Sequence, residues 1–448
     1  MDALILRNFR CFGDPGKVPL KPLTLLIGEN STGKTSFLAA VRLASDISYS
    51  GRTIDFNERP FQLGSFNEIA HYKGGRAGRA QTFEIAFESL VRRHGRRPHK
   101  AGREGGSPSL RSMRHSAVFR RSGSHPVIAS QSLKFGEHQI TVSSQPSADQ
   151  PALEYRLGDS TETIPLQNLP IPSPAEAAFD WHYALYVTMD GPRIQRKKGA
   201  ANNKLSTRPA FREVVQIAAG TMWRGRPICI APVRTTPLRT YDPVSDTPVP
   251  EGAHIPMVLA KLFFQEKDEW KSLKDTLDRF GKESGLFTGV YIKALGRYES
   301  DPFQIRVGIK GPQANLVDVG YGVSQALPIL VEALRSDSGA VHLMQQPEVH
   351  MHPRSQAALG SFLAGLAANQ EKQFIVETHS DYLVDRVRMD IRDGKSITPD
   401  DVVLLYFERQ GSEIVIHPIT IDSAGNLVGE PDTYRSFFLT EERRFLGL

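Results

Sequence analysis

The chain has 448 residues, of which 40% are hydrophobic and 23% charged, proportions that are ordinary for a soluble globular protein of two or three lobes. Two cysteines, Cys11 and Cys229, exclude a disulfide framework and a cysteine-based zinc site. Because no apolar run is long enough to span a membrane and Met1-Asp2-Ala3 begins no signal peptide, we expect a cytoplasmic protein with no membrane partner.

The net charge of +6 is concentrated in residues 92–121, which we name the basic segment. It holds ten Lys or Arg against one Glu, a net +9, so the rest of the chain sums to −3. Its richness in Gly, Ser and Pro predicts a mobile loop. Such a loop can bind nucleic-acid phosphates, dock an acidic partner or be simply solvated, and composition does not separate these alternatives.

The first predicted elements are a strand over residues 2–9 and a buried strand over 23–27. The second runs into Gly28-Glu29-Asn30-Ser31-Thr32-Gly33-Lys34-Thr35, and a helical pattern follows from Ser36 to Ala44. The order of strand, Gly-rich loop and helix, with the spacing Gly-x4-Gly-Lys-Thr, is typical of a phosphate-binding loop.

The chemistry of this loop predicts a nucleoside triphosphate with Mg²⁺. Backbone N–H groups and the helix N-terminus would surround the phosphates, Lys34 would reach the β and γ phosphates, and the Thr35 hydroxyl would ligate Mg²⁺. The predicted nucleotide contacts are Gly28, Asn30, Ser31, Thr32, Gly33, Lys34, Thr35 and Ser36.

Further along the chain, strands are predicted at 82–87, 126–143 and 152–165, and a second basic loop at 193–208. Residues 255–286 have the spacing of one or two amphipathic helices. Strands follow at 303–309, 340–344, 373–376, 401–407 and 413–419, with an apolar helix ending near Leu334 and a terminal helix over 434–446. The short apolar runs at 340–344 and 373–376 are typical of a parallel sheet covered on both faces.

Three further motifs follow the phosphate loop: Gly320-x-Gly322-x-Ser324-Gln325, the run from Gln345 to Pro353, and Glu377-Thr378-His379-Ser380. With the opening Leu6-Arg7-Asn8-Phe9-Arg10-Cys11-Phe12, this order resembles the ABC-type ATPase heads of the RecF, SMC and OLD group. The resemblance covers roughly residues 1–90 and 300–448.

The resemblance implies an α/β fold: an ABC-type ATPase head with a RecA-like parallel-sheet core, an antiparallel β lobe and an inserted helical lobe. It places an N-terminal ATPase lobe at 1–235, a helical insertion at 236–300 and a C-terminal ATPase lobe at 301–448. It also implies ATP and Mg²⁺ as cofactors and adds Asn8 and Arg10 to the nucleotide contacts. Two copies would face each other around two ATP molecules, with Gly322 and Ser324 of one copy contacting the γ-phosphate held by the other.

The resemblance implies a catalytic set formed by Gln345, Gln346, Glu348 and His379. The strand before Gln345 should deliver an acid that positions Mg²⁺, yet Gln345 and Gln346 are neutral and accept no proton, so hydrolysis is in doubt although ATP binding is not. Three readings stay open: a slow natural hydrolase or ATP-gated switch, transfer of the acidic role to Glu348, or a Glu→Gln change at 345 made to trap ATP. The third is preferred because one change restores the family string "EQPE".

The sequence also suggests roles for three histidines and two glutamines. His350 and His352 are interpreted as part of the loop that leads to the dimer contact rather than as metal ligands, since no further ligands complete a set. His379 would touch the γ-phosphate, although an N-cap at Thr378 or Ser380 with His379 as a bystander also fits. Gln62 and Gln81 are both candidates for the glutamine that contacts Mg²⁺.

Only about 50 residues follow Asp401, too few for the Toprim nuclease domain of OLD relatives. Any cutting of nucleic acid would then need a separate partner. The resemblance implies a homodimer or higher homo-oligomer that controls such an effector protein, for example a nuclease, in bacterial anti-phage defence. The alternative is a RecF-like repair ATPase whose ATP-closed dimer grips DNA.

Overall fold

The computed structural model describes residues 1–48, 53–75, 78–92, 110–143, 152–165, 225–243, 245–309, 311–411 and 413–447. The chain forms two compact units, and each is discontinuous in sequence. The first comprises Met1–Leu20, Ala39–Arg226 and Arg409–Val415, and the second Lys21–Leu38, Pro227–Glu408 and Ile416–Leu448. The predicted lobes are continuous, whereas residues 21–38 group with the C-terminal half. The predicted loop at 193–208 lies outside the described residues.

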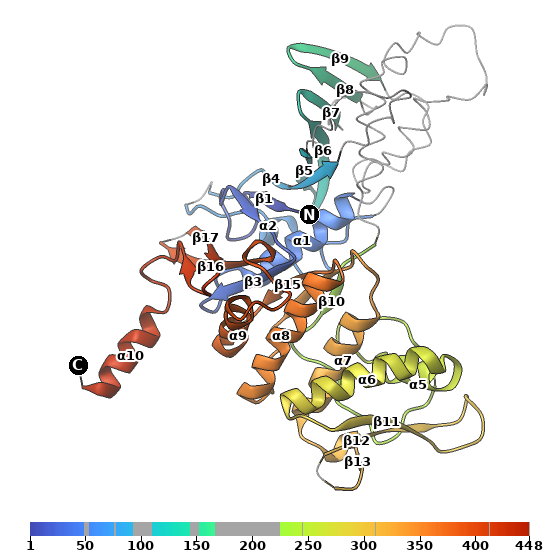
Figure 1. The fold of residues 1–448 in the computed structure, drawn as a ribbon. Coiled ribbons are helices and arrows are strands. Elements are labelled where there is room, and N and C mark those ends of the chain that lie inside the picture. Colours follow the sequence, from blue (N-terminus) through green and yellow to red (C-terminus); the bar gives the residue numbers. More distant parts are fainter. Residues whose placement is uncertain are drawn as a thin grey trace, which may run out of the picture. The chain divides into compact units, whose positions relative to one another are not determined.

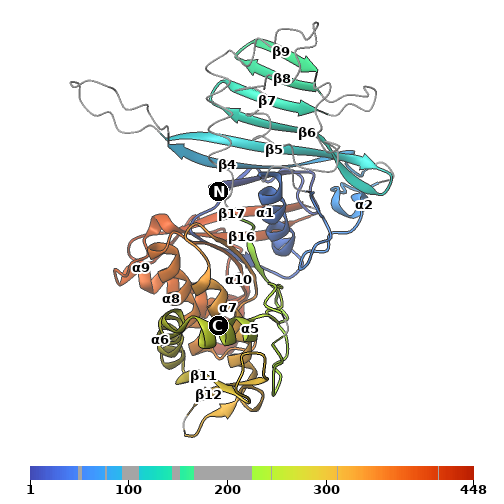
Figure 2. The ribbon, with the colours of Figure 1, turned by 90° about the vertical axis from the view of Figure 1, so that its right-hand side faces the viewer.

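The first unit is built on an eight-stranded antiparallel sheet in the order β2-β1-β4-β5-β6-β7-β8-β9, and Figure 2 shows its longer strands side by side. Its strands are β1 (Ala3–Arg7), β2 (Lys17–Pro19), β4 (Thr82–Arg92), β5 (Leu110–Ser122), β6 (His125–Phe135), β7 (His138–Ser143), β8 (Ala152–Leu157) and β9 (Ser160–Pro165). The predicted strands at 82–87, 126–143 and 152–165 are therefore confirmed.

Part of the prediction for the basic segment is wrong. Residues 110–121 are not a loop but lie in strand β5, which pairs with β4 on one side and β6 on the other. The prediction relied on the average composition of the segment, in which arginines dominate. Met113, Ala117 and Phe119 are nevertheless buried on one face of the strand, and arginines occupy other positions. Residues 93–109 lie outside the described residues.

Aromatic side chains make the core of the first unit. Phe83 of β4 stacks on Phe119 of β5 with ring centroids 4.9 Å apart, and the edge of Phe56 meets Phe119 at 5.2 Å. Phe66 opens the short helix α2 (Phe66–Ile69) and packs on the same Phe83 ring. These contacts attach the segment after α1 (Lys34–Ser48) to the sheet.

The second unit is built on a seven-stranded sheet in the order β10-β14-β15-β3-β16-β17-β18. Its strands are β3 (Leu23–Gly28), β10 (Ile228–Ile230), β14 (Val341–Gln345), β15 (Gln373–Glu377), β16 (Val402–Gln410), β17 (Glu413–Ile421) and β18 (Leu427–Val428). The pairs from β10 through β16 are parallel, so the carboxyl ends of five strands share one edge. The predicted parallel core is confirmed.

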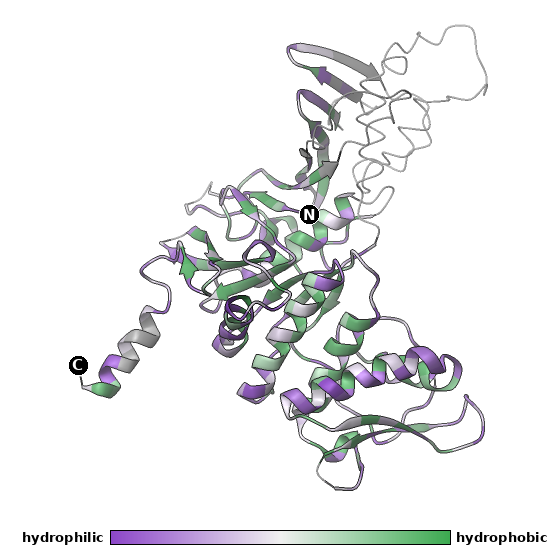
Figure 3. Ribbon diagram, in the orientation of Figure 1, coloured by the Kyte–Doolittle hydropathy of each residue, from purple (hydrophilic) through white to green (hydrophobic). Residues whose placement is uncertain are grey.

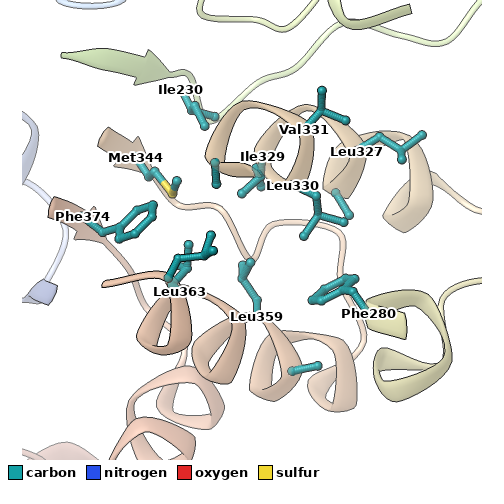
Figure 4. Close-up of a cluster of buried hydrophobic side chains, with 14 of the residues drawn as sticks. Ile230, Phe280, Leu327, Ile329, Leu330, Val331, Met344, Leu359, Leu363 and Phe374 are labelled. Atoms are coloured by element: carbon teal, nitrogen blue, oxygen red, sulfur yellow. The ribbon is translucent and has the colours of Figure 1, made fainter. Parts of the chain in front are cut away.

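Helices pack on this sheet through one apolar core. They are α5 (Ile255–Gln265), α6 (Lys267–Ser284), α7 (Tyr321–Arg335), α8 (Pro353–Asn369) and α9 (Asp381–Arg392). Figure 4 shows Leu359 and Leu363 of α8 lying near Met344 of β14 and Phe374 of β15, with Phe280 of α6 at the far side. The helices α5 and α6 confirm the amphipathic pattern predicted for 255–286.

The remaining elements of the second unit are short. A three-stranded antiparallel sheet contains β11 (Gly289–Ala294), β12 (Phe303–Gly308) and β13 (Ala314–Asn315), and 3₁₀ turns lie at Leu316–Asp318 and Pro399–Asp401. The chain ends in α10 (Ser436–Leu446), drawn in red in Figure 1. Figure 3 shows mostly hydrophilic residues along α6, and the apolar side chains that this helix buries include Leu273, Leu277 and Phe280. Within the described residues, no helix is long and apolar enough to cross a membrane.

Candidate functional site

The predicted phosphate loop joins β3 to α1 (Lys34–Ser48), at the edge of the sheet where the parallel strands end. Gly28 has φ +135°, and a Cβ there would lie 2.5 Å from the carbonyl oxygen of Phe407 on β16, so only glycine fits. Ser31 and Gly33 also have positive φ, and the Thr32 hydroxyl donates to the Glu29 carbonyl at 2.8 Å. The loop therefore turns tightly around its own backbone before the helix begins.

Lys34 fills the inside of this loop. Its side chain is 3% exposed, and its Nζ donates to the carbonyls of Gly28 at 2.9 Å and Glu29 at 2.6 Å. Burial lowers the pKa of the ammonium, while the carboxylates of Glu377 and Glu29 act in the opposite direction. A cation held inside a loop that precedes a helix N-terminus is what phosphate binding requires.

The Thr35 hydroxyl donates to Glu377 Oε2 at 2.8 Å. Glu377 is the last residue of β15, which pairs with β3 and places Glu377 opposite Leu26. The carboxylate is 6% exposed, and burial raises its pKa, whereas the Thr35 hydrogen bond and Lys34 lower it. Sequence reasoning did not select Glu377 as a site residue, although its position at the end of an apolar run was a usable signal.

Gln345 lies on the other side of Glu377, as the last residue of β14 in register with it. Its side chain is 6% exposed, and among the described residues its Oε1 has no hydrogen-bond partner. Gln346 follows with φ +43°, and its N–H donates to the Glu377 carbonyl at 2.8 Å. The structure thus places Gln345 and Gln346 beside Glu377, whose carboxylate accepts the hydrogen bond from Thr35.

Glu348 is bonded to the predicted histidine segment. Its Oε1 accepts from the backbone N–H of His379 at 2.7 Å. Burial raises the pKa of the Glu348 carboxyl, while the His379 N–H and the charge of Arg234 lower it. Glu377, not Glu348, is the acid bonded to Thr35.

His379 is exposed and stands between β15 and α9. Burial of its ring lowers its pKa, and so does the charge of Lys34. Ser380 is the N-cap of α9, and its Oγ accepts from the N–H of Leu383 at 3.1 Å. Ser380 therefore caps α9, as one of the two interpretations proposed, and the exposed ring of His379 is not needed for the cap.

The third predicted motif lies at the start of α7, where Gly320 and Tyr321 are exposed and Gly322 is half-buried. Ser324 is 6% exposed, and its hydroxyl donates to the Tyr321 carbonyl at 2.9 Å. In this conformation the accessible groups of the motif are those of residues 320–322, and the Ser324 hydroxyl is engaged within its own helix. Contact of Gly322 and Ser324 with a second copy stays a prediction.

Asn8 and Arg10 belong to the first unit, where both have positive φ. The Arg10 guanidinium donates to the carbonyls of Leu63 at 3.2 Å and Glu68 at 3.1 Å. A cavity of about 440 Å³ is lined by Arg10 together with Gln62. Gln81 is not among its lining residues, and its amide donates to the carbonyl of Arg79. Of the two glutamine candidates, only Gln62 shares a cavity with Arg10.

A second cavity, of about 430 Å³, borders the phosphate loop in the second unit. Its lining includes Glu29 and Asn30 of the loop, His379 and Asp381 after β15, and Arg435 before α10. Arg435 donates to Asp381 at 3.0 Å and to Asp385 at 3.0 Å. The loop and the histidine segment therefore face one hollow, large enough to admit a ligand beside the loop.

The donor set fits a magnesium nucleotide. Mg²⁺ takes oxygen ligands and is usually held by one or two protein groups together with phosphate oxygens. Thr35 offers a hydroxyl oxygen that already donates its hydrogen bond to Glu377. Gln345 offers a second buried oxygen, Oε1, which has no hydrogen-bond partner among the described residues. No group of three or more His, Cys, Asp or Glu in the described part of the chain could hold a metal ion alone.

Comparison with known proteins places an ATPase domain on these residues. The model of the AAA ATPase domain family matches residues 1–68 and 260–384, which contain the phosphate loop, α7, β14 and His379. Over these residues the chain is similar to the AAA ATPase domain family, and the predicted α/β fold with a parallel-sheet core is confirmed.

Three solved structures of SMC heads resemble the chain loosely. An SmcHead bound to the C-winged helix domain of ScpA has 10% identity and a TM-score of 0.43, covering 94% of this chain and 98% of that one. The SMC head domain from Thermotoga maritima has 10% identity and a TM-score of 0.38, with 93% and 98% covered. An Smc head with an extended coiled coil, bound to the C-terminal domain of ScpA and derived from Pyrococcus furiosus, has 9% identity, a TM-score of 0.41 and 99% of both chains covered.

Proposed function

We propose that this ATPase domain binds and hydrolyses Mg²⁺-ATP at the loop of residues 28–35, closes a pair of copies around the nucleotide, and thereby controls a separate effector. The observation that carries the proposal is the contact between Thr35 and Glu377, with Lys34 inside the loop beside it. It gives the loop a cation, a hydroxyl ligand and an acid at one end of the sheet.

Each residue has a distinct task in this proposal. Lys34 moves its hydrogen bonds from the Gly28 and Glu29 carbonyls to phosphate oxygens, which become the stronger acceptors. The Thr35 hydroxyl would keep its hydrogen bond to Glu377, which leaves its oxygen lone pairs free to hold the metal. Bound Mg²⁺ supplies neutralisation of the charge that develops on the β and γ oxygens.

The glutamines determine the rate. The amide of Gln345 can hold a water molecule through Oε1 but cannot accept its proton, so the turnover we propose is slow. His379, whose pKa is lowered, would be a neutral donor to the transferred phosphate near pH 7. The N–H of Gln346 donates to the Glu377 carbonyl, which holds Gln346 next to the end of β15.

The proposed pairing follows from the exposed start of α7. Backbone N–H groups at a helix N-terminus form an anion site, and Gly320 and Tyr321 are exposed there. In the pair, this end of one copy would meet the γ-phosphate at the loop of the other. The effector, a nuclease acting in anti-phage defence, is proposed on the family resemblance of the motifs.

The test uses the full chain and its Lys34→Ala variant. Calorimetry with a non-hydrolysable ATP analogue and Mg²⁺ should give heat with the parent and none with the variant, and light scattering should show association of copies only in the parent. Absence of heat with the parent would refute nucleotide binding. Tight ATP-dependent binding of duplex DNA by the isolated protein would favour the RecF-like alternative, whereas copurification with a nuclease would favour effector control.

A further inference from the structure

Arg234 lies at the same edge of the sheet as the candidate site, four residues after the end of β10. Its segment is fixed by backbone hydrogen bonds from Ala231 N–H to Pro250 at 3.0 Å and from Thr235 N–H to Glu251 at 2.9 Å. The side chain is only 4% exposed, which is unusual for an arginine that follows an edge strand.

The Arg234 guanidinium spans two segments of the site. Its Nε donates to Gln325 Oε1 on α7 at 3.2 Å, and its Nη2 donates to the carbonyl of Pro347 at 3.3 Å. Gln325 directly follows Ser324, and Pro347 lies between Gln346 and Glu348. One rigid planar group therefore joins the start of α7 to the loop that leaves β14.

The partners of Arg234 differ from those of another buried arginine of the chain, Arg42. Arg42, in the first unit, is 3% exposed and is paired with the carboxylates of Asp46 and Glu58. Within the described residues, Arg234 has hydrogen bonds only to an amide and to backbone carbonyls. Burial lowers its pKa to about 10, and Glu348 is the charge that opposes this effect. Burying a cation without a hydrogen-bonded carboxylate costs free energy. What the guanidinium contributes here is a fixed distance between the two segments that it bonds.

The contacts continue from Arg234 to the histidine segment. Glu348 follows the carbonyl that Arg234 holds, and its Oε1 accepts from the His379 N–H at 2.7 Å. A shift of α7 would therefore pull on Arg234, on the 346–348 loop, and through Glu348 on the start of α9.

We infer that Arg234 is a positioning residue: it holds α7 in a fixed relation to the loop after β14, so that contact of α7 with a second copy sets the position of Glu348 and His379. The inference rests on the proposed function and adds a route between pairing and hydrolysis. Among the described residues, the hydrogen bonds of Arg234 go to Gln325, Ala231 and Pro347 and not to the phosphate loop, so nucleotide binding itself should not need it.

The test compares Arg234→Lys, Gln325→Met and the double variant with a matched control, Arg239→Gln. Arg239 lies on the same segment, but its side chain is 60% exposed and is paired with Asp318. Phosphate release, ATP-dependent association and ATP affinity are measured for each, with the Gln345→Glu change also present in a second set to raise turnover. If Arg234→Lys folds poorly, Gln325→Met still tests the inference, because it removes the acceptor of the hydrogen bond that Arg234 donates to α7.

We expect Arg234→Lys to lower kcat and ATP-dependent association about tenfold while the ATP affinity stays within about twofold, since lysine can reach only one of the two acceptors. The double variant should be no more than about twofold worse than Arg234→Lys, because both changes break one link. Equal kcat in Arg234→Lys and Arg239→Gln, or a parallel loss of ATP affinity and thermal stability, would overturn the inference. A parent that binds no ATP would instead refute the proposed function, and the inference with it.

Discussion

Thr35 and Glu377 are 342 positions apart in the chain, yet the hydroxyl of the first donates to the carboxylate of the second at 2.8 Å. The contact arises because β15 pairs with β3 and both strands end at the phosphate loop. Gln345 lies one strand further away, in register with Glu377. The acid closest to the expected metal ligand therefore comes from β15, whereas the motif resemblance directs attention to β14.

Glu377→Gln should lower the affinity for Mg²⁺ more than the affinity for ATP, so that nucleotide binding needs a higher Mg²⁺ concentration. The amide can still meet the Thr35 hydroxyl but no longer attracts its proton with a charge, and the loss of such an outer partner typically costs 10–100-fold in metal affinity. The measurement is a Mg²⁺ titration of nucleotide binding by fluorescence. Glu371→Gln, on the exposed turn before β15, is the matched control. Equal Mg²⁺ midpoints in the two variants would contradict the role of Glu377.

Gln345→Glu should raise the rate of ATP hydrolysis, by roughly 10²-fold if the new carboxylate acts as a positioned base. The buried Oε1 of Gln345 has no partner among the described residues, so a carboxylate there can orient a water molecule or the metal. Steady-state phosphate release measures the effect. Gln373→Glu makes the same change at the first residue of β15, at the opposite edge of the sheet. A rate that does not rise would count against the reading of Gln345 as a substituted glutamate.

Lys34→Met should weaken ATP binding about tenfold to hundredfold, because a charge-assisted hydrogen bond contributes about 1.5–3 kcal/mol. The methionine side chain can fill the same space inside the loop without donating to phosphate. Calorimetry with a non-hydrolysable analogue gives the affinity. The control is Lys261→Met on α5, whose half-exposed ammonium pairs with Asp246 at 3.6 Å. An affinity unchanged in Lys34→Met would mean that the nucleotide lies elsewhere.

His342 should make stability depend on pH. It is fully buried on β14, stacked on Phe374, and burial, aided by the charge of Lys372, lowers its pKa to about 3. The unfolded chain takes up this proton near pH 6.5, so stability is lost as pH falls from about 6.5 toward 3, by at most about 1.4 kcal/mol per pH unit. His342→Leu should flatten the slope of unfolding free energy against pH. His125→Leu, at an exposed position of β6, should leave it unchanged. Identical slopes in parent and His342→Leu would refute the assignment.

Local patterns predicted the elements whose signals are short-range. The apolar run before Gly28 and the helix after it are both present, as are the amphipathic helices at 255–286. The strand β5 was missed because its buried positions, such as Met113 and Phe119, alternate with arginines that dominate the composition. Periodicity rather than average polarity is the better guide there.

The site depends on register, which sequence alone does not give. The contact of Glu377 with Thr35 follows from the order and register of β15 and β3. The hydrogen bond of the Ser324 hydroxyl to the Tyr321 carbonyl follows from the position of Ser324 in the first turn of α7. Arg234 belongs to no motif, and its relation to Gln325 and Pro347 depends on the path of the chain after β10. Residues of one motif were found from the sequence, whereas contacts between motifs were not.

Strand β3 lies between β15 and β16, whose residues are made more than 340 positions after it. As the polypeptide emerges from the ribosome, the apolar segment Leu23–Ile27 has neither neighbour until most of the chain has been translated. Such distant pairings form slowly and leave aggregation-prone surface uncovered for a time. A newborn chain that stalls before residue 373 would therefore expose this segment, and we expect nascent molecules to need shielding by a chaperone until translation has passed β16.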